Sequence, residues 1–403
     1  MTTSFLLRCA SLGITLLRPC ALLYYALIKL LRPVQHKVTF ISRQSDATPT
    51  DFILLAASLA RLDRSLKIKI ICCSEAARSA RFLGQLRQTS RELWHIASSS
   101  AVVLDDYTPS VSFFSQRKKL YVLQMGHRLG MLKRTFWQVV DMPGEPSSCI
   151  ATALRMHANY TAVLAPSEAL RESYRHAFRV ARTRIHVIAL PRYEVLRNPD
   201  MNRLDIVISN HPELFANTPV VFYAPTFRGD AEGTQRWMKA LKKLVHAAEV
   251  QGLTLIVKTH PRSSSQCTIL ADEQVGELAQ LSRSPHVILN PPIDTLDLLA
   301  VVDHVISDYS SVAFEAAISG KPVWFYLYDY DEYLDQYGLN VDPTQYMPAA
   351  CFADSQALLD ALTQSSLPSV AQEQFLHAFV QSPENMQTTA AQQIARLVLQ
   401  GIQ

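Results

Sequence analysis

Short runs of β-branched and aromatic residues alternate along this chain with helical stretches of roughly ten residues or more, and this alternation restricts the fold more than any other feature. Parallel strands need long crossover connections, usually helices, so the pattern predicts parallel sheets with helices on both faces. The strands expected first are 37–41, 66–71, 101–104, 120–123 and 162–164. A second series follows at 220–223, 253–257, 286–289, 302–306 and 322–326. We therefore expect an α/β fold with two Rossmann-like domains.

The length of the chain agrees with two domains. Its 403 residues, 48% hydrophobic and 18% charged, can bury two large cores. The polar stretch 197–200 separates the two series of strands and contains Asn198 and Pro199, which favour a turn, so it is a candidate hinge. We predict a first domain over 37–196, a second over 197–365, and a helical tail over 366–403 that crosses back to the first domain.

The first 36 residues contain Arg8, Arg18, Lys29 and Arg32 and no acidic residue. Two charge-free apolar runs flank Arg18 and Pro19, and neither reaches the roughly 18 residues that span a bilayer. A signal peptide is disfavoured because the basic residues are interspersed. We expect Pro19 to split the segment into two short amphipathic helices that attach the protein peripherally to anionic lipids on the cytoplasmic face of the membrane. The alternative is that these helices pack on the protein itself.

Charge and cysteine usage exclude other classes of function. The formal net charge is only +4 and its excess lies in the N-terminal segment, which argues against a nucleic-acid-binding surface. Seven scattered cysteines with no C-x-x-C pair argue against a zinc or disulfide-exchange site and fit a reduced, cytosolic compartment.

His127 is the first candidate catalytic residue. Ligands of open parallel sheets bind beyond the carboxyl ends of the strands, and His127 directly follows the predicted strand 120–123. Imidazole titrates near neutral pH and can take a proton from an attacking hydroxyl. Gly126 and Gly130 would let the backbone approach a ligand, and Lys133 could face a phosphate. A purely structural histidine is the alternative.

Two further segments follow strands of the second domain. Thr226 and Arg228 come after strand 220–223, and a guanidinium can bind phosphate oxygens bidentately. His260 comes after strand 253–257 and precedes Pro261, which favours an extended backbone and an imidazole that donates to a phosphate or to the leaving group. A solvated turn for Arg228 and a strand-closing role for His260 are the alternatives.

The stretch after strand 302–306 resembles a phosphate cradle without glycines. Ser310 and Ser311 stand where the next helix starts, so hydroxyls, free backbone N–H groups and the positive end of the helix dipole come together there. Asp308 either caps this helix or belongs to the site.

Together these segments resemble a known family. The ordered set 223–228, His260-Pro261, 307–311 and 321–326, followed by Asp329 and Tyr333, is similar to the CDP-glycerol glycerophosphotransferases of teichoic acid and capsule synthesis. The similarity extends to Pro191-Arg192 and to 337–339, and covers about 37 to 362. Gly126, Arg128, Leu190 and Glu194 depart from the family pattern, all in the half that approaches the acceptor.

The resemblance implies a two-domain fold of the glycosyltransferase-B (GT-B) type with an interdomain cleft, and a membrane-associated enzyme. It implies His127 and His260 as the catalytic histidines. It also implies CDP-glycerol or CDP-ribitol as donor, a lipid-linked glycan as acceptor and CMP as product. Residues expected to contact the donor phosphates are Thr226, Arg228, Asp308, Ser310 and Ser311, and supporting or acceptor-side residues are Gly130, Lys133, Arg192 and Glu315.

Two other functions stay open from the sequence. An ordinary GT-B glycosyltransferase would move a sugar from a nucleotide sugar, and a non-catalytic membrane-bound protein could keep the same fold. In-line transfer of the phosphoryl group needs mainly positioning and charge neutralisation, so no cofactor is required, and a role for Mg²⁺ stays open. The D-x-D triplet 329–331 equally suits a solvated acidic turn, so we predict no metal site there.

Overall fold

The computed structural model describes residues 2–73, 82–215, 219–226, 228, 230–259, 272–364, 369–382 and 388–403. Contacts divide the chain into two compact units. The first comprises Met1–Arg128, Thr135–Arg192 and Gln381–Gln403, and the second comprises Leu129–Arg134 and Tyr193–Val380. The short segment Leu129–Arg134 therefore leaves the first unit and packs within the second.

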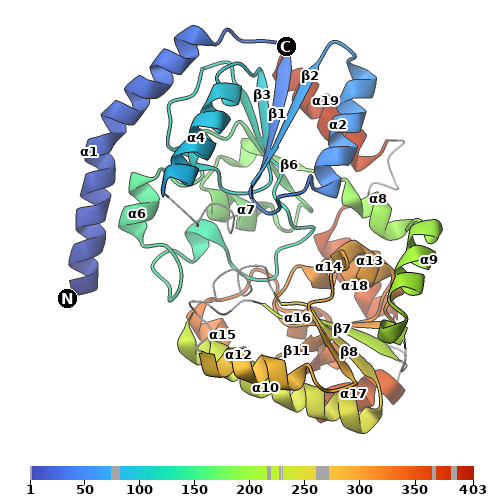
Figure 1. Cartoon of the computed structure of the whole chain (residues 1–403). Coiled ribbons are helices and arrows are strands. Elements are labelled where there is room, and N and C mark those ends of the chain that lie inside the picture. Colours follow the sequence, from blue (N-terminus) through green and yellow to red (C-terminus); the bar gives the residue numbers. More distant parts are fainter. Residues whose placement is uncertain are drawn as a thin grey trace. The chain divides into compact units, whose positions relative to one another are not determined.

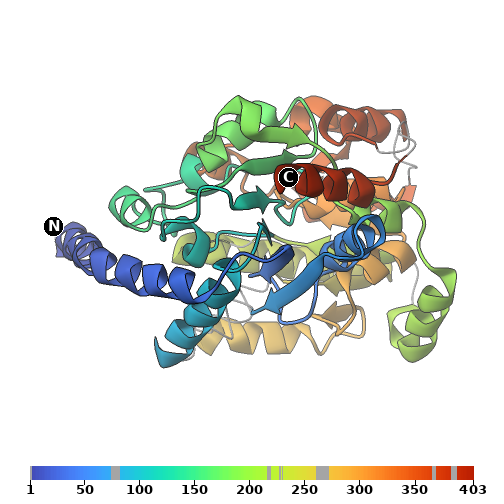
Figure 2. The same cartoon turned by 90° about the horizontal axis from the view of Figure 1, so that it is seen from above.

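The first unit is built on a six-stranded parallel sheet with the strand order β2-β1-β3-β4-β5-β6. Strands β1 and β3 are buried along their whole length, as expected for a parallel sheet covered on both faces. Helix α19 (Ala390–Gly401) packs against α2 (Thr50–Leu62), so the end of the chain returns to this unit (Figure 2). The strands are β1 (Lys37–Ser42), β2 (Lys67–Cys72), β3 (Ala101–Leu104), β4 (Tyr121–Gln124), β5 (Ala162–Ala165) and β6 (Ile185–Val187); the other helices are α4 (Phe82–Ile96), α5 (Pro109–Ser112), α6 (Ser148–Ala153) and α7 (Arg171–Phe178).

The N-terminal segment forms one continuous helix, α1 (Thr2–Leu31), with Pro19 inside it (Figure 1). The predicted division into two short helices is therefore wrong. Contacts on both sides of the proline explain why the helix continues despite the missing N–H. The Ser11 hydroxyl donates to the Cys149 carbonyl at 3.1 Å, and the Tyr25 hydroxyl donates to the Gln116 side chain at 2.8 Å.

Within the described chain, α1 is the helix long and apolar enough to cross a membrane, over Leu7–Leu31 with a mean hydropathy of 1.6. One side of α1 nevertheless packs against α4 and α6 of the first unit. Arg117 secures its end by donating to the carbonyls of Lys29 and Arg32. A crossing of the bilayer would require these contacts to break.

The second unit is built on another six-stranded parallel sheet, with the order β12-β11-β10-β7-β8-β9. Its strands are β7 (Val220–Ala224), β8 (Thr254–Val257), β9 (Val287–Leu289), β10 (His304–Ser307), β11 (Val323–Tyr326) and β12 (Cys351–Phe352). Its helices are α8 (Arg192–Arg197, whose first residue belongs to the first unit), α9 (Met201–Asn210), α10 (Ala231–Gln251), α12 (Asp272–Leu281), α13 (Thr295–Val301), α14 (Val312–Ile318), α15 (Tyr330–Gln336), α16 (Pro343–Tyr346), α17 (Ser355–Gln364) and α18 (Ser369–Phe379).

Local sequence explains where key helices of the second unit begin and end. Asp230 accepts from the Gly233 N–H at 2.6 Å and caps α10, which ends at Gly252 in the left-handed conformation. The predicted hinge stretch 197–200 holds the last residue of α8 and the residue that caps α9, Asp200.

The predicted α/β fold with two Rossmann-like sheets is confirmed, and all ten predicted strands are present. In the first sheet the order of the strands reverses between β1 and β3, and in the second between β7 and β10. Ligands of such sheets bind beyond the strand ends at these switch points, so a functional site is expected at the residues that follow β1, β3, β7 and β10.

Candidate active site

Asp105 lies at the switch point of the first sheet, directly after β3. Its carboxylate accepts from the Ser42 hydroxyl at the end of β1 and from the Arg43 N–H at 2.9 Å. Burial raises the pKa of Asp105 to about 7, while these hydrogen bonds oppose the shift. The two strand ends are thus joined by a buried carboxyl group.

His127 follows β4, the strand next to β3. Gly126 before it has a φ of 74°, a conformation that a bulkier residue adopts only with strain. The Nδ1 atom of His127 lies 3.1 Å from the Asp105 carbonyl oxygen. A carbonyl can only accept, so Nδ1 carries the proton and Nε2 keeps its lone pair. Burial and the charge of Arg128 lower the pKa of His127, which keeps the ring neutral near pH 7.

Arg192 holds the backbone at His127. Its guanidinium donates to the His127 carbonyl at 2.6 Å and to the Asp51 carboxylate at 2.7 Å. The Arg192 N–H also donates to Asp51, at 2.8 Å. Asp51 belongs to the first turn of α2, so this ion pair fixes the loop that carries the imidazole to a helix of the same unit.

Gly130 and Lys133 lie on the segment that packs in the second unit. A Cβ atom at Gly130 would come within 2.1 Å of the Phe314 ring, so glycine is needed there for contact with protein. The sequence had suggested that this glycine admits a ligand; the side chain of Phe314 takes that space. Lys133 is half-buried and pairs with Leu339, and its carbonyl accepts from the Asn340 amide at 3.0 Å.

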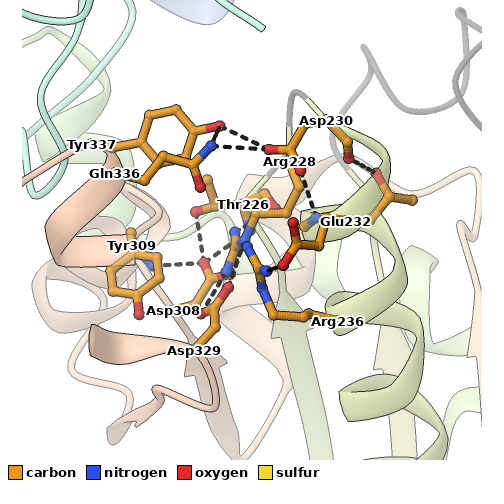
Figure 3. Close-up of polar contacts among 12 residues, drawn as sticks. Thr226, Arg228, Asp230, Glu232, Arg236, Asp308, Tyr309, Asp329, Gln336 and Tyr337 are labelled. Atoms are coloured by element: carbon orange, nitrogen blue, oxygen red, sulfur yellow. Dashed lines mark hydrogen bonds and ion pairs between the residues drawn. The ribbon is translucent and has the colours of Figure 1, made fainter. Parts of the chain in front are cut away.

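Thr226, Arg228 and Asp308 meet at the switch point of the second sheet, after β7 and β10 (Figure 3). The Asp308 carboxylate accepts from the Thr226 N–H at 2.8 Å and from the Thr226 hydroxyl at 2.6 Å. The Arg228 guanidinium donates to the same carboxylate at 3.1 Å. Asp308, after β10, is therefore hydrogen-bonded to Thr226, after β7. It does not cap α14, whose N-cap position is occupied by Ser311.

A second carboxylate completes the surroundings of Arg228. Asp329 accepts from Nε at 3.0 Å and from Nη2 at 3.1 Å, a bidentate pair that is almost fully buried. The rings of Tyr309 and Tyr333 stack with centroids 3.7 Å apart, and the guanidinium carbon lies 4.9 Å from the Tyr333 centroid. The described contacts of Arg228 are thus with carboxylates, aromatic rings and the Thr226 carbonyl at 2.9 Å, and phosphate binding by its guanidinium stays a prediction.

Ser310 and Ser311 are half-buried and precede α14. Ser311 occupies the N-cap position without a side-chain cap bond, and Glu315 lies buried in the following turn. His260, predicted as the second catalytic histidine, lies outside the described residues. Its strand β8 ends at Val257, and the Thr259 N–H donates to Asn290 at 2.8 Å.

Comparison with known proteins decides the family. The sequence model of the CDP-glycerol:poly(glycerophosphate) glycerophosphotransferases matches residues 24–400. The chain belongs to this family. It is a glycerophosphotransferase-like enzyme, as its motifs predict.

Relatives of this glycerophosphotransferase-like enzyme include primases and polymerases of teichoic acid. A teichoic acid ribitol-phosphate primase of Bacillus spizizenii is 26% identical over 83% of this chain and 84% of its own length. A teichoic acid glycerol-phosphate primase of the same organism is 26% identical over 68% of this chain and 67% of its own length. The solved wall teichoic acid polymerase TagF matches with a TM-score of 0.65 and 19% identity over 98% of each chain, and this likeness confirms the GT-B-like fold.

Two contributors to the site of this enzyme were not predicted from the sequence, Asp51 and Asp105. Asp105 follows a predicted strand at 101–104, so the rule that selected His127 could also have selected it. Asp51 had no such signal, because its partner Arg192 is 141 positions away in sequence.

Proposed function

We propose that this enzyme transfers glycerol phosphate, or the related ribitol phosphate, from a CDP-alditol to a hydroxyl of a lipid-linked glycan in teichoic acid or capsule synthesis. It releases CMP and acts at the cytoplasmic face of the membrane. The family match over residues 24–400 supports the reaction class. The relatives that are ribitol-phosphate and glycerol-phosphate primases support an alditol donor, and do not choose between the two alditols.

The chemistry we assign to His127 is that of a general base. The acceptor oxygen attacks the β-phosphorus of the donor, a new O–P bond forms, and the bond from this phosphorus to the bridging oxygen of CMP breaks. The acceptor proton passes to Nε2 of His127, and CMP leaves with the bond electrons. The observation that supports this role is the Nδ1 contact of 3.1 Å with the Asp105 carbonyl, which leaves Nε2 as the acceptor.

In this proposal the donor phosphates contact Ser310, Ser311 and His260. Thr226, Arg228 and Asp308 act as positioning residues, because their described hydrogen bonds join the ends of β7 and β10. Asp51 and Arg192 position His127 from the opposite side of its loop. Residues that hold reacting groups in place account for much of the rate in phosphoryl transfer, where the protein makes few covalent bonds.

Peripheral membrane association is supported by the surface of α1 and its neighbour α4. Leucines that include Leu23, Leu27 and Leu30 are exposed on α1. Trp94 of α4 is also exposed, and the Arg32 guanidinium lies 4.5 Å from its ring. Exposed leucines beside an interfacial tryptophan and basic residues are typical of a helix lying in the headgroup region.

A donor screen tests the function. Purified full-length enzyme is incubated with membranes containing acceptor and with CDP-glycerol, CDP-ribitol or a UDP-sugar, and the released nucleotide is identified. We expect CMP from one of the CDP-alditols and no UDP. Release of UDP would instead identify a glycosyltransferase, and donor binding without nucleotide release for every acceptor would identify a non-catalytic protein.

A further inference from the structure

A pocket of about 500 Å³ lies between α1 and α6, two helices that pack side by side in the first unit (Figure 1). Its lining combines polar side chains with apolar surface, and consists of Ser11, Thr15, Arg18, Ser148, Cys149, Thr152, Ala153 and Arg155. None of the residues discussed above as the candidate active site lines it. The proposed reaction therefore leaves this pocket without a role.

Two arginines share this pocket without a carboxylate partner among the described residues. Arg18 has a buried Nε with no hydrogen-bond partner there, and its guanidinium carbon lies 5.8 Å from the centroid of the Phe113 ring. Burial and then the charge of Arg18 lower the pKa of Arg155. Asp141 contacts the backbone of the pocket at Ser148, whose N–H it accepts from at 2.7 Å. Two guanidinium groups that repel each other make an anion a favourable occupant.

The backbone at Arg155 adopts an uncommon conformation. Its φ is 52°, in the left-handed region that non-glycine residues rarely enter. Hydrogen bonds on both sides hold it there. The Tyr107 hydroxyl donates to the Leu154 carbonyl at 3.2 Å, and the Trp137 indole donates to the Met156 carbonyl at 3.0 Å. A strained residue that its neighbours fix in this way is a feature that functional sites often show.

The pocket also borders exposed apolar surface. Leu12 and Leu16 directly follow Ser11 and Thr15 along α1 and are 60% and 68% exposed. A ligand with both a phosphate and a hydrocarbon chain would thus find donors in the pocket and apolar contacts beside it. A free phosphate would use only the donors.

We propose that this pocket binds the phosphate group of a membrane lipid, with Arg18 and Arg155 as its charged donors and the Thr152 hydroxyl as a further contact. Guanidinium groups match phosphate oxygens with paired hydrogen bonds. Two lipids share this chemistry: an anionic glycerophospholipid and a prenyl diphosphate. The second would make the pocket a binding site for the lipid end of the acceptor, and that identification rests on the proposed function.

Binding of soluble probes to the full-length enzyme in neutral detergent tests the pocket. The probes are farnesyl diphosphate, dioctanoyl phosphatidylglycerol and inorganic pyrophosphate, titrated by calorimetry without any donor. We expect the R18Q/R155Q variant to bind the lipid probes at least about tenfold more weakly than the parent. The R64Q/K118Q variant loses the same charge at two exposed positions outside the pocket and outside the N-terminal segment, and should change by less than about twofold.

The three probes also distinguish a prenyl diphosphate from a phospholipid as the ligand of the pocket. Tighter binding of farnesyl diphosphate identifies a prenyl diphosphate as the occupant, and tighter binding of phosphatidylglycerol identifies a phospholipid. Pyrophosphate binding as tight as both lipid probes would overturn the lipid assignment. Equal losses of affinity in the two double variants, or no binding of either lipid probe by the parent, would overturn the proposal that this pocket binds lipid.

Failure of the pocket and failure of the proposed function can be told apart, because this measurement involves no turnover. If the enzyme releases CMP yet binds neither lipid probe, only the proposal of a lipid-binding pocket is contradicted. Thermal denaturation of each variant checks folding. If R18Q/R155Q melts well below the parent, R155Q decides the question, because it leaves Arg18 over the Phe113 ring.

Discussion

The guanidinium of Arg192 donates a hydrogen bond of 2.6 Å to the main-chain carbonyl of His127. The same guanidinium pairs with Asp51 at 2.7 Å, and both side chains are largely buried. The proposed base is therefore held in place by an ion pair that touches its backbone and leaves its Nε2 atom unconstrained. Replacing a residue of this ion pair should therefore lower turnover, because the base would be displaced.

We predict that Arg192→Lys lowers kcat by roughly tenfold, because an ammonium cannot bond to Asp51 and to the His127 carbonyl in the same fork geometry. The KM for the donor should stay within about twofold, since Arg192 contacts no donor in the proposed mechanism. Steady-state kinetics measure both. Arg182→Lys, at a position 61% exposed, is the matched control and should behave as the parent. Unchanged kcat in Arg192→Lys would contradict the positioning role.

His127→Gln should lower turnover by roughly 10²-fold or more with little loss of stability, because glutamine cannot accept the proton. His157 provides the contrast. It is buried, its Nδ1 lies 3.0 Å from the Tyr160 hydroxyl, and its ring centroid lies 4.3 Å from that of Phe136. His157→Ala should instead cost roughly 2–4 kcal/mol of stability by leaving a cavity. CMP release measures turnover and urea unfolding measures stability, so the two effects are separated. Near-parental turnover in His127→Gln would refute the role of His127 as general base.

The pKa of Asp105 gives a prediction about pH. Its folded-state pKa of about 7 lies above the ordinary value of 3.8, so between these values the unfolded chain releases a proton that the folded chain retains. This group therefore makes the protein less stable as pH rises through that window. Asp105→Asn removes the effect, and its free energy of unfolding relative to the parent should increase by about 1 kcal/mol or more from pH 4.5 to pH 7.5. Parallel stability profiles in urea unfolding would contradict this.

The sequence predicted most of the framework of the fold. Apolar runs of strand length are typical of the buried strands of a parallel sheet, and for this reason ten of the twelve described strands were found. The two strands not predicted, β6 and β12, are short edge strands of three and two residues, whereas the edge strand β9, also of three residues, was predicted. Pro19 was expected to end a helix, but side-chain contacts along α1 outweigh the loss of one hydrogen bond, and such contacts are not visible in local sequence.

The surroundings of Arg228 could not be predicted from its motif, and its contact with phosphate stays a prediction. A guanidinium after a strand suits phosphate, yet its neighbours in space are Asp308 and Asp329, 80 and 101 positions away in sequence. Glycine at position 130 was correctly associated with close approach, but the group that approaches is the Phe314 ring. Both outcomes depend on which distant side chains the fold brings together.

The buried pair of Arg228 and Asp329 leads to a stability prediction. Asp329→Ala removes a bidentate partner from a guanidinium that is only 3% exposed, and should cost roughly 3–5 kcal/mol. The pair of Arg236 and Glu232 is a surface control, with Glu232 81% exposed, and Glu232→Ala should cost less than about 1 kcal/mol. Chemical denaturation measures both. Similar small losses in the two variants would mean that the buried pair adds little to stability.

The exposed leucines of α1 give the last prediction, which concerns the membrane. Leu23 and Leu30 are 64% and 82% exposed, so L23Q/L30Q removes apolar surface with little change in packing. Its partition onto phosphatidylglycerol vesicles should fall at least about tenfold, because each leucine loses the benefit of transfer to the interface. The control I53Q/I206Q removes two side chains that are 53% and 60% exposed on other helices, and should bind as the parent does. Sedimentation with vesicles measures the partition. Equal binding by both double variants would show that the basic residues of the segment, and not its leucines, hold the enzyme at the membrane, and binding should then vanish at high salt.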